Sequence, residues 1–430
     1  MNETRFKKTD IGEVPEDWDI DSLGNIINVL TDYTANGSFA SLAENVTYLD
    51  HIDYARLVRL TDLRANFKNN GIYVSKSSYD FLKKSKLHGG EILLANVGAY
   101  AGYSFVYPKK MPFVGTLGPN MFLIKLDNNR IQDSYGIYIF IYGCVFDQLL
   151  SKATSSAQPK LNKDNVRECL FSCPKDKKEQ QRIATVLSDI DVLLSTLNKK
   201  IEKKKLIKQG VMQQLLTGKK RLNGFTRPWV KKNITEICTI KARIGWQGLK
   251  TDEYLDYGNY VLITGTDFEN GGINWLNCSF VSKERFEQDE NIKIKQGDVL
   301  ITKDGSIGKV AYLDFIPMEG TLNSGVFVVR PKDISHLNNN YLALFFKSKF
   351  FEDFISQLKA GSTIAHLYQK DFIRLQLNYP KDLSEQVAIA TILSDMDKEI
   401  EVLEAKRVKY KQVKQGMMQQ LLTGRIRLID

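Results

Sequence analysis

The chain has 430 residues, of which 43% are hydrophobic and 10% aromatic, so it can form two or three domains with cores of their own. Its net charge of +10 favours a polyanionic partner, most simply a nucleic acid, although charge does not distinguish DNA from RNA. The longest apolar run, near residues 135–145, is too short to span a bilayer, and the first residues do not read as a secretory signal. These features exclude a membrane-spanning or secreted protein and predict a cytoplasmic one.

The cysteines do not indicate a disulfide framework or a metal site. There are five, an odd number at low density. Cys169 and Cys173 are four residues apart, but no second cysteine pair or nearby histidine completes a set of metal ligands. We therefore expect these side chains to be small apolar groups in cores.

The first segment in chain order, residues 1–174, mixes short β-branched strands with helices and predicts an α/β or α+β globule. Within it, Gly90-Glu-Ile-Leu-Leu94 predicts a strand that runs into the glycine-containing loop NVGAYAG. Gly115-Thr-Leu117 leads into a second apolar strand, MFLIKL.

The second segment, residues 175–222, predicts one long helix. Apolar residues recur every three or four positions without a proline, and a helix of about 40 residues would be ~60 Å long. Gly210 inside it costs ~1 kcal/mol relative to alanine, and Gly218 suits a C-terminal cap. A lysine cluster favours a solvated face, with phosphate contact or a partner surface as the alternative; it comprises Lys199, Lys200, Lys203, Lys204, Lys205 and Lys208.

The rest of the chain repeats the first half. Over Glu179–Leu222 against Glu385–Leu428, 25 of 44 positions are identical at a constant offset of 206 residues. The globular segments correspond more faintly: Gly297-Asp-Val-Leu-Ile301 and the loop KDGSIGK align with the first strand and loop, and Gly361–Leu367 aligns with Ser155–Leu161. The helices therefore share a task, and the globules have different ones.

This order predicts an α/β (α+β) architecture of two globular domains joined and separated by two long antiparallel helices with internal pseudo-two-fold symmetry. The predicted boundaries are 1–174 and 223–380 for the globular domains, and 175–222 and 381–430 for the helical repeat regions. We expect the helices to bury a shared coiled-coil seam of Ile183, Leu187, Ile190, Leu194, Leu197, Ile201, Ile389, Leu393, Met396, Ile400, Leu403 and Tyr410.

Motifs for catalysis are missing from the sequence. No Asp/Asn-Pro-Pro-aromatic motif is found, and Gly305-Ser-Ile-Gly-Lys309 is shorter than a phosphate-binding loop, with Val310 in place of Ser or Thr. The four histidines lack an HExxH or triad-like context. The acids Asp189 and Asp191, with their repeats Asp395 and Asp397, are expected at exposed or partner-facing positions rather than in a nuclease centre.

The whole chain resembles the specificity subunits of type I restriction-modification systems. The blocks IATVLSDID…QGVMQQLLTG and IATILSDMD…QGMMQQLLTG carry the resemblance, and GEILLANVGAYAG and GDVLITKDGSIGK are similar to that family's recognition-domain pattern. The first copy departs from this pattern, with Ala-Tyr-Ala where the second has Ser-Ile.

The resemblance implies a DNA-reading subunit without catalysis of its own. Each globule would be a target-recognition domain that reads one half of a split, asymmetric target in double-stranded DNA. The helices would set the spacing and dock two modification subunits, adenine methyltransferases that carry S-adenosylmethionine. Two restriction subunits that use ATP and Mg²⁺ could join them, so that this chain itself would need no cofactor and no metal.

We expect DNA contacts from polar and basic side chains on loops. The candidates in the first domain are Asn96, Tyr100, Ser155, Ser156, Gln158 and Lys160, and those in the second are Lys303, Ser306, Lys309, Ser362, Thr363 and His366. Ordinary polar loops and a structural histidine are the alternatives for these residues. For the whole chain, the alternatives are a coiled-coil scaffold that binds only protein and a self-sufficient restriction or modification enzyme.

Overall fold

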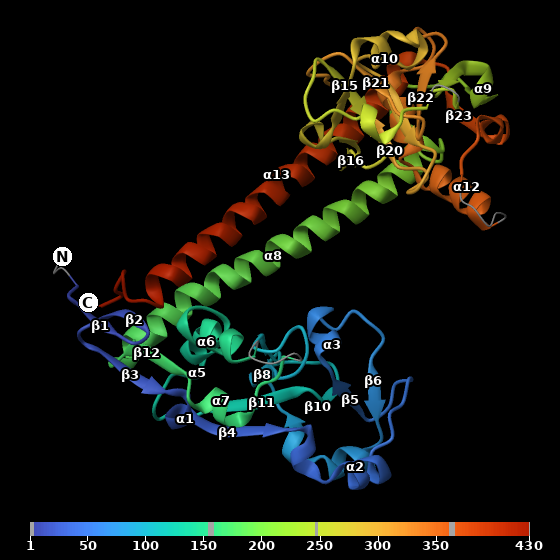
Figure 1. Cartoon of the computed structure of the whole chain (residues 1–430). Coiled ribbons are helices and arrows are strands. Elements are labelled where there is room, and N and C mark those ends of the chain that lie inside the picture. The colour runs from blue at the N-terminus through green and yellow to red at the C-terminus, as the bar shows by residue number, and fades with distance from the viewer. Residues whose placement is uncertain (1–3, 154–158, 246–247, 361–365, 430) are drawn as a thin grey trace. The chain divides into compact units, whose positions relative to one another are not determined.

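A computed structural model describes residues 4–153, 159–245, 248–360 and 366–429, and the chain divides into two compact units (Figure 1). The first unit comprises residues 1–197 and 406–430, and the second comprises residues 198–405. Each unit therefore holds one globule, called a head below, and a part of each long helix.

The two repeated blocks form the two long helices, α8 (Lys177–Leu216) and α13 (Leu383–Leu421). At 40 residues, α8 is ~60 Å long. Gly218 and Gly424 follow the helices with φ of 70° and 69°, a left-handed conformation that favours glycine at a helix end. The head strands end at Pro174 and Pro380, next to the domain boundaries expected from the sequence, which remain predictions.

The first head contains two four-stranded sheets. One is antiparallel in the order β4 (Ile27–Asp32), β11 (Met121–Leu126), β8 (Ile92–Ala95) and β9 (Ser104–Val106). The other has the order β6 (Ile72–Val74), β5 (Ala55–Val58), β10 (Val114–Leu117) and β7 (Lys86–Leu87), with β5 and β10 parallel. Two strand pairs complete it, β1 (Phe6–Thr9) with β2 (Gly12–Pro15) and β3 (Trp18–Ser22) with β12 (Leu170–Pro174). Its helices are α1 (Leu23–Ile26), α2 (Phe39–Asn45), α3 (Leu60–Arg64), α4 (Lys76–Phe81), α5 (Asp133–Ile141), α6 (Cys144–Ala153) and α7 (Lys163–Arg167).

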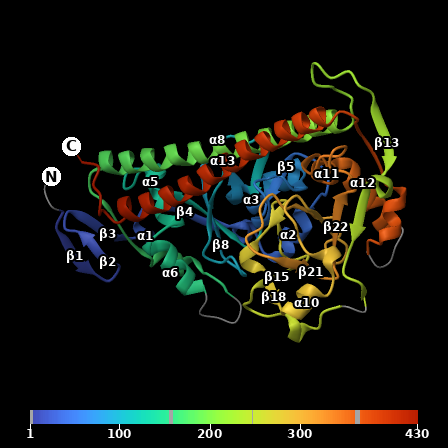
Figure 2. The same cartoon turned by 90° about the horizontal axis from the view of Figure 1, so that it is seen from above.

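The second head has a similar framework, with an antiparallel four-stranded sheet and a mixed sheet of three strands instead of four. Its antiparallel sheet runs β14 (Cys238–Lys241), β22 (Val326–Pro331), β19 (Val299–Thr302) and β20 (Val310–Tyr312). Its mixed sheet runs β18 (Ser279–Val281), β15 (Tyr260–Ile263) and β21 (Gly320–Leu322), with β15 and β21 parallel. Several of its strands, among them β15, β18, β21 and β22, are labelled in Figure 2. The remaining pairs are β13 (Trp229–Asn233) with β23 (Gln376–Pro380) and β16 (Phe268–Glu269) with β17 (Gly272–Ile273). Its helices are α9 (Ile234–Ile237), α10 (Lys283–Glu287), α11 (Asn339–Phe346) and α12 (Lys349–Ala360).

The apolar stripe of each long helix is largely buried. Side chains at most of the predicted seam positions are buried, namely Ile183, Leu187, Ile190, Leu197, Ile201, Ile389, Leu393, Ile400 and Leu403. Leu194, Met396 and Tyr410 are half-buried. In the first unit the start of α8 shares a core with Leu421 and Leu422 near the end of α13, and in the second the end of α8 shares a core with the start of α13. The helices are therefore antiparallel within each unit.

A lysine and an aspartate pair across the helices in each unit. Lys208 binds Asp397, and 206 residues further on Lys414 Nζ lies 2.6 Å from Asp191 Oδ1. Asp191 and Asp397 each bind a lysine of the opposite helix, although their side chains stay 43% and 41% exposed, and Asp189 and Asp395 are exposed, as expected from the sequence. Part of the lysine cluster has the same role, since Lys204 and Lys205 bind Glu399 and Glu404 at 2.7 and 2.8 Å. The ion pairs were missed because they depend on the helix register, which the spacing of one helix does not fix.

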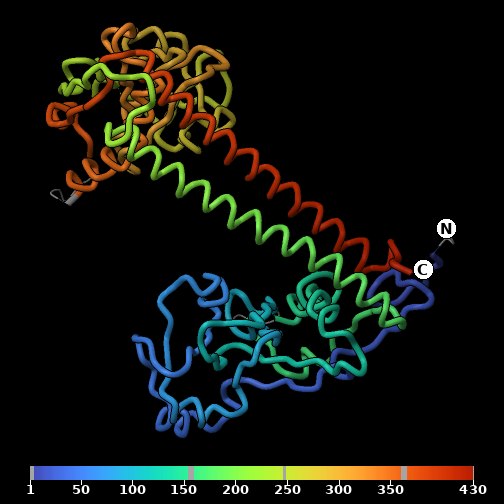
Figure 3. The backbone as a smooth tube through the Cα atoms, turned by 180° about the vertical axis from the view of Figure 1, so that it is seen from behind, coloured from blue at the N-terminus to red at the C-terminus, as the bar shows by residue number. Residues whose placement is uncertain are grey.

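A buried glutamate at the start of each long helix receives an arginine from beyond the end of the other. Arg427 reaches both carboxylate oxygens of Glu179 at 2.7 and 2.8 Å, and Arg221 reaches those of Glu385 at 3.0 and 2.5 Å. Arg427 also binds Asp17 at 2.7 Å, and both ends of the chain belong to this unit (Figure 3). Bidentate pairing offsets the cost of burying each carboxylate.

The next residue of the repeat attaches each helix to its own head. The Gln180 side-chain amide donates to Pro174 O at 2.8 Å, and its carbonyl accepts from Gln132 N–H at 3.0 Å. Gln386 makes the equivalent bonds with Pro380 O and Asn338 N–H, both at 2.8 Å. The Glu-Gln pair at the start of both repeated blocks therefore has a structural function in each unit.

Cys169, Cys238 and Cys278 are buried, as expected, whereas Cys144 and Cys173 are half-buried. All five are free, and burial raises the pKa of Cys169 to about 11 and that of Cys173 to about 12. In the described part of the chain, no helix has the length and apolar character that crossing a membrane requires.

We predict that Arg427→Met lowers the free energy of unfolding of the first unit by about 3 kcal/mol, because it leaves Glu179, whose side chain is 1% exposed, buried without its cation. Urea unfolding of the full chain measures this change. Lys283→Met, which removes an exposed pair with Glu287, is the matched control and should have no measurable effect. Equal losses of unfolding free energy in the two variants would contradict the conclusion that Arg427 stabilises the buried Glu179 carboxylate.

Candidate nucleic-acid interface

In the first head, the loop after β8 meets the segment that follows α6. Leu161 N–H donates to Asn96 O at 2.8 Å, and Gly98 N–H donates to Pro159 O at 2.9 Å. Lys160 is exposed at this junction, where it pairs with Val97 in an isolated β-bridge. Two sequence-predicted residues, Asn96 and Lys160, are thus brought together, whereas Ser155, Ser156 and Gln158 lie outside the described residues.

The Asn96 and Tyr100 side chains have different surroundings. Asn96 Oδ1 is buried, and no donor in the described part of the chain reaches it. Tyr100 is half-buried, and the exposed guanidinium of Arg64 lies 4.0 Å from its ring centroid. The sequence did not identify Arg64 as a neighbour of Tyr100, because Arg64 lies far along the chain from the glycine-containing loop. The one indication was a basic residue directly after the aligned Arg59–Leu63 segment.

In the second head, the loop after β19 meets the segment that follows α12 through equivalent contacts. Leu367 N–H donates to Lys303 O at 2.9 Å, which repeats the Asn96–Leu161 bond. His366 Nδ1 contacts Asp304 Oδ1, and its ring centroid lies 4.3 Å from that of Tyr368. Lys303 and His366 are therefore neighbours in the fold, and Ser362 and Thr363 lie outside the described residues.

A buried threonine holds the turn that carries the remaining candidates. The Thr302 hydroxyl donates to Ser306 O at 2.5 Å and accepts from Lys309 N–H at 3.0 Å. Ser306 and Lys309 are exposed on this turn, and Lys303 Nζ lies 5.4 Å from the ring centroid of Phe327. The turn places Lys309 at the surface and Lys303 half-buried beside an aromatic ring, and their contact with DNA remains a prediction.

The Asn96–Lys160 junction opens into a groove of about 800 Å³ in the first head. It is lined by Asp32, Tyr33, Thr34, Phe39, Leu42, Ala43, Val46, Tyr48, Asn96, Val97, Pro119, Asn120, Met121, Phe122, Lys160, Leu161, Asn162 and Lys163. Phe39 and Tyr48 are 83% and 50% exposed, and Lys163 Nζ lies 2.9 Å from Asp32 Oδ2. Burial raises the pKa of Asp32, but hydrogen bonds from Lys163 and Thr34 outweigh it and lower the pKa overall.

The groove residues outside the loops were missed from the sequence. Four separate parts of the chain form the groove, so no single motif of the sequence marks it. In the described residues, no group of three or more histidine, cysteine, aspartate or glutamate side chains is arranged to hold a metal ion.

These features define a class of protein: two heads with one framework, each presenting a different set of polar and basic loops, and each joined to two antiparallel helices. The sequence model described as type I restriction modification DNA specificity domain matches residues 15–206 and 226–411. The chain belongs to this family.

Similar proteins agree over nearly the full length. The putative type I restriction enzyme MjaX specificity subunit of Methanocaldococcus jannaschii is 26% identical, with 99% of this chain and 97% of that protein aligned. The crystal structure of the type I restriction-modification S subunit from M. genitalium has a TM-score of 0.57 at 15% identity and covers 94% of this chain and 96% of that one. A second solved structure, described as the structural basis of complex assembly and conformational transition of the type I R-M system, has a TM-score of 0.58 at 14% identity. The alignment covers 96% of this chain and 99% of that chain. The two structures show that the fold is shared.

We predict that Thr302→Val loosens the turn that carries Ser306 and Lys309, because it removes both bonds of a fully buried hydroxyl. Amide exchange at Lys309 should accelerate about tenfold, which corresponds to ~1.4 kcal/mol. The exposed Thr266→Val is a control in the same head. Unchanged exchange at Lys309 would show that the hydroxyl does not hold the turn.

Proposed function

We propose that this chain is the DNA-reading subunit of a cytoplasmic type I restriction-modification complex, in which each head reads one half of a split, asymmetric target. One observation carries this proposal: equivalent backbone contacts hold loops of different chemistry, with Asn96 and Lys160 in one head and Lys303 and His366 in the other. A shared framework with different reading groups fits two unlike half-sites. The net charge of +10 favours contact with phosphates.

We further propose that the long helices set the distance between the half-sites and dock two adenine methyltransferase subunits. Apolar side chains that the helices leave exposed support the docking, including Val192, Leu206 and Val402 at 62%, 68% and 67%. In this proposal the chain has no catalytic role. S-adenosylmethionine would belong to the methyltransferase subunits, and ATP and Mg²⁺ to two further restriction subunits.

A head exchange tests the proposal. The full chain, co-expressed with the modification subunit encoded beside it, should methylate adenines in a split sequence, and replacing residues 16–174 by those of another specificity subunit should change one half-site only. Methylation by the chain alone would favour a self-sufficient enzyme. A complex that methylates all DNA equally, or a change in both half-sites, would contradict the modular reading, and a complex that does not bind DNA would favour the protein-only scaffold.

We predict that Asn96→Ala changes sequence preference within one half-site, because a base-reading amide is lost, and weakens binding to the preferred sequence by about 1–3 kcal/mol. Binding of the methyltransferase complex to duplexes varied in one half-site at a time measures this change. Asn70→Ala, at an exposed asparagine of the same head, is the control. A uniform loss across all sequences would assign Asn96 to backbone contact instead.

Substitutions of the exposed lysines should affect DNA binding in a different way from Asn96→Ala. Lys160→Ala and Lys309→Ala are expected to weaken binding about equally on all sequences and to lower the slope of log K against log salt by ~0.9 each, since each removes one phosphate contact. Titrations at several salt concentrations measure the slope, with Lys283→Ala as a control on the surface of the second head. If the slope of log K against log salt is unchanged within error in both variants, these lysines do not contact DNA phosphates.

A further inference from the structure

The groove beside the Asn96–Lys160 junction has a shape that the reading of base edges does not require. Side chains that read an intact duplex project from the protein surface into the grooves of the DNA. This part of the first head is instead hollow, with about 800 Å³ of space between the segments that carry Asp32, Phe39 and Asn120 and those that carry Asn96 and Lys160. Sites of this size typically take a small molecule or a part of a larger one. The groove therefore fits a group that leaves the DNA duplex.

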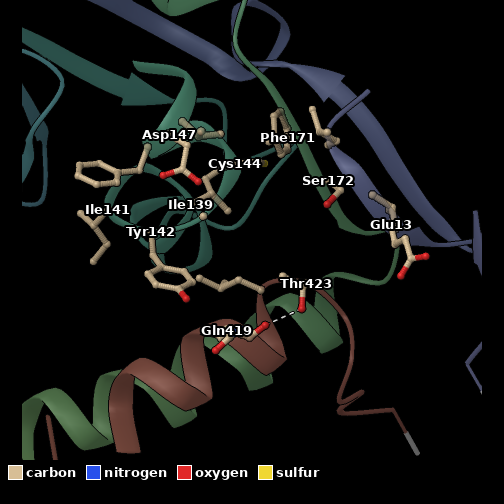
Figure 4. A pocket seen from close by; sticks show the side chains of 16 residues that line it. Glu13, Ile139, Ile141, Tyr142, Cys144, Asp147, Phe171, Ser172, Gln419 and Thr423 are labelled. Atoms are coloured by element: carbon tan, nitrogen blue, oxygen red, sulfur yellow. Dashed lines mark hydrogen bonds between the residues drawn. The ribbon is translucent and has the colours of Figure 1, made fainter. Parts of the chain in front are cut away.

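A second cavity of the first unit has a different chemistry. It lies where the end of α13 meets the α5–α6 corner, has a volume of about 470 Å³, and has Glu13 and Asp147 in its lining (Figure 4). The described residues that line it include no lysine or arginine, whereas Lys160 and Lys163 both line the groove. Because cations attract a polyanion, the groove is the better site for a part of a nucleic acid.

Two aromatic side chains of the groove are accessible to a ligand. Phe39 is 83% exposed and Tyr48 is 50% exposed, and both line the groove. The Tyr48 hydroxyl donates to the hydroxyl of the buried Tyr33 at 3.2 Å, which holds one edge of the ring in place. Aromatic side chains stack with any nucleobase, because every base has a π-face. This part of the groove therefore provides affinity for a base without choosing among bases.

Hydrogen-bond acceptors in the groove can make that choice. Asn96 Oδ1 is buried and has no donor among the described residues, and an acceptor without a donor is unfavourable inside a protein. Burial raises the pKa of Asp32, but hydrogen bonds from Lys163 and Thr34 outweigh it and lower the pKa overall, so the carboxylate is ionised at neutral pH. Two acceptors favour a base that carries an amino group, which thymine lacks.

The second head uses the equivalent positions in another way. Tyr48 and Tyr254 begin the same tripeptide, Tyr-Leu-Asp, 206 residues apart, and the Tyr254 hydroxyl accepts a hydrogen bond from Asn323. By the register of β4 on β11 and of β14 on β22, the position of Tyr33 is taken by Arg243. This arginine is 2% exposed and donates to β21. The surroundings of the two tyrosines are thus specific to the first head, so a ligand of the groove should affect one half-site only.

We propose that the groove of the first head binds one base extruded from the DNA duplex, a base with an amino group whose ring stacks on Phe39 or Tyr48. The amino group donates to Asn96 or Asp32, and Lys160 contacts the adjoining phosphate. Unpairing a base is unfavourable, and stacking and hydrogen bonds in the groove offset that cost. The base is not the adenine that is methylated, because that adenine must enter the methyltransferase. The inference rests on the proposed function, which makes DNA the ligand, and it adds how one half-site is recognised.

The test uses the complex of the full chain with the modification subunit encoded beside it, and duplexes that contain the split target. In each duplex one base of the first half-site loses its partner, because the opposite strand has an abasic site there. At one position other than the methylated adenine, the complex should bind about tenfold more tightly, since no base pair has to be broken. The base at that position should be adenine, cytosine or guanine.

Phe39→Ala should weaken binding to the intact target by about tenfold, because the extruded base loses a stacking surface. The same variant should bind a duplex that lacks the extruded base as well as the wild type does. Phe39→Trp, which keeps an aromatic ring, should restore affinity for the intact target. Ile52→Ala is the matched control, since this side chain of the same head is 82% exposed and does not line the groove, and its affinity should equal that of the wild type. Both positions are exposed, so all three variants should melt as the wild type does.

The inference is overturned if no unpaired position binds more tightly. It is also overturned if Phe39→Ala weakens binding equally to the intact duplex and to the duplex without the extruded base, which would place Phe39 against paired DNA. Methylation of the split target and the head exchange are measured separately on the wild-type complex. If the exchange changes one half-site while no unpaired position binds more tightly, only the inference fails. If the wild-type complex methylates all DNA equally or binds none, the proposed function and the inference both fail.

Discussion

The architecture depends on a buried carboxylate at the start of each long helix that is neutralised by an arginine from beyond the end of the other. Without Arg427 or Arg221, Glu179 or Glu385 would be charged in a nearly dry environment, which costs several kcal/mol. The pairing therefore ties one helix to the segment that follows the other, and it does so once in each unit. The neighbouring glutamine then binds the head strand and the start of a head helix, so two adjacent residues fix both the helix pair and the head.

The two heads share the backbone contacts between these loops but differ in the side chains at the loop surface. The bonds Asn96–Leu161 and Lys303–Leu367 join the same two segments in each head, while the side chains nearby are an amide and a lysine in one case and a lysine and a histidine in the other. Main-chain hydrogen bonds do not depend on side-chain identity, so the loops can vary without loss of the framework. The first head also has a groove beside this junction, whose lining includes the aromatic side chains of Phe39 and Tyr48.

The parts of the structure that sequence could predict are those that local periodicity and internal repetition encode. The spacing of Ile183, Leu187 and Ile190 identified a buried helix face, and the aligned loops identified the segments that meet in each head. The pairing of Lys208 with Asp397 could not be predicted, because it depends on the register between residues 189 positions apart. The groove around Phe39 and Tyr48 could not be predicted either, since it forms only when four separate segments fold together.

The chain segments that form each unit also determine the order in which the two units can be completed during synthesis. Residues 198–405 are continuous, so the second unit is fully made once residue 405 has left the ribosome. The first unit begins at the N-terminus but needs residues 406–430, among them Arg427. Chains grow from the N-terminus at ~5–20 residues per second. The unit that is begun first is therefore the last to be completed, and until then Glu179 lacks its cation and the apolar start of α8 is not covered by the end of α13.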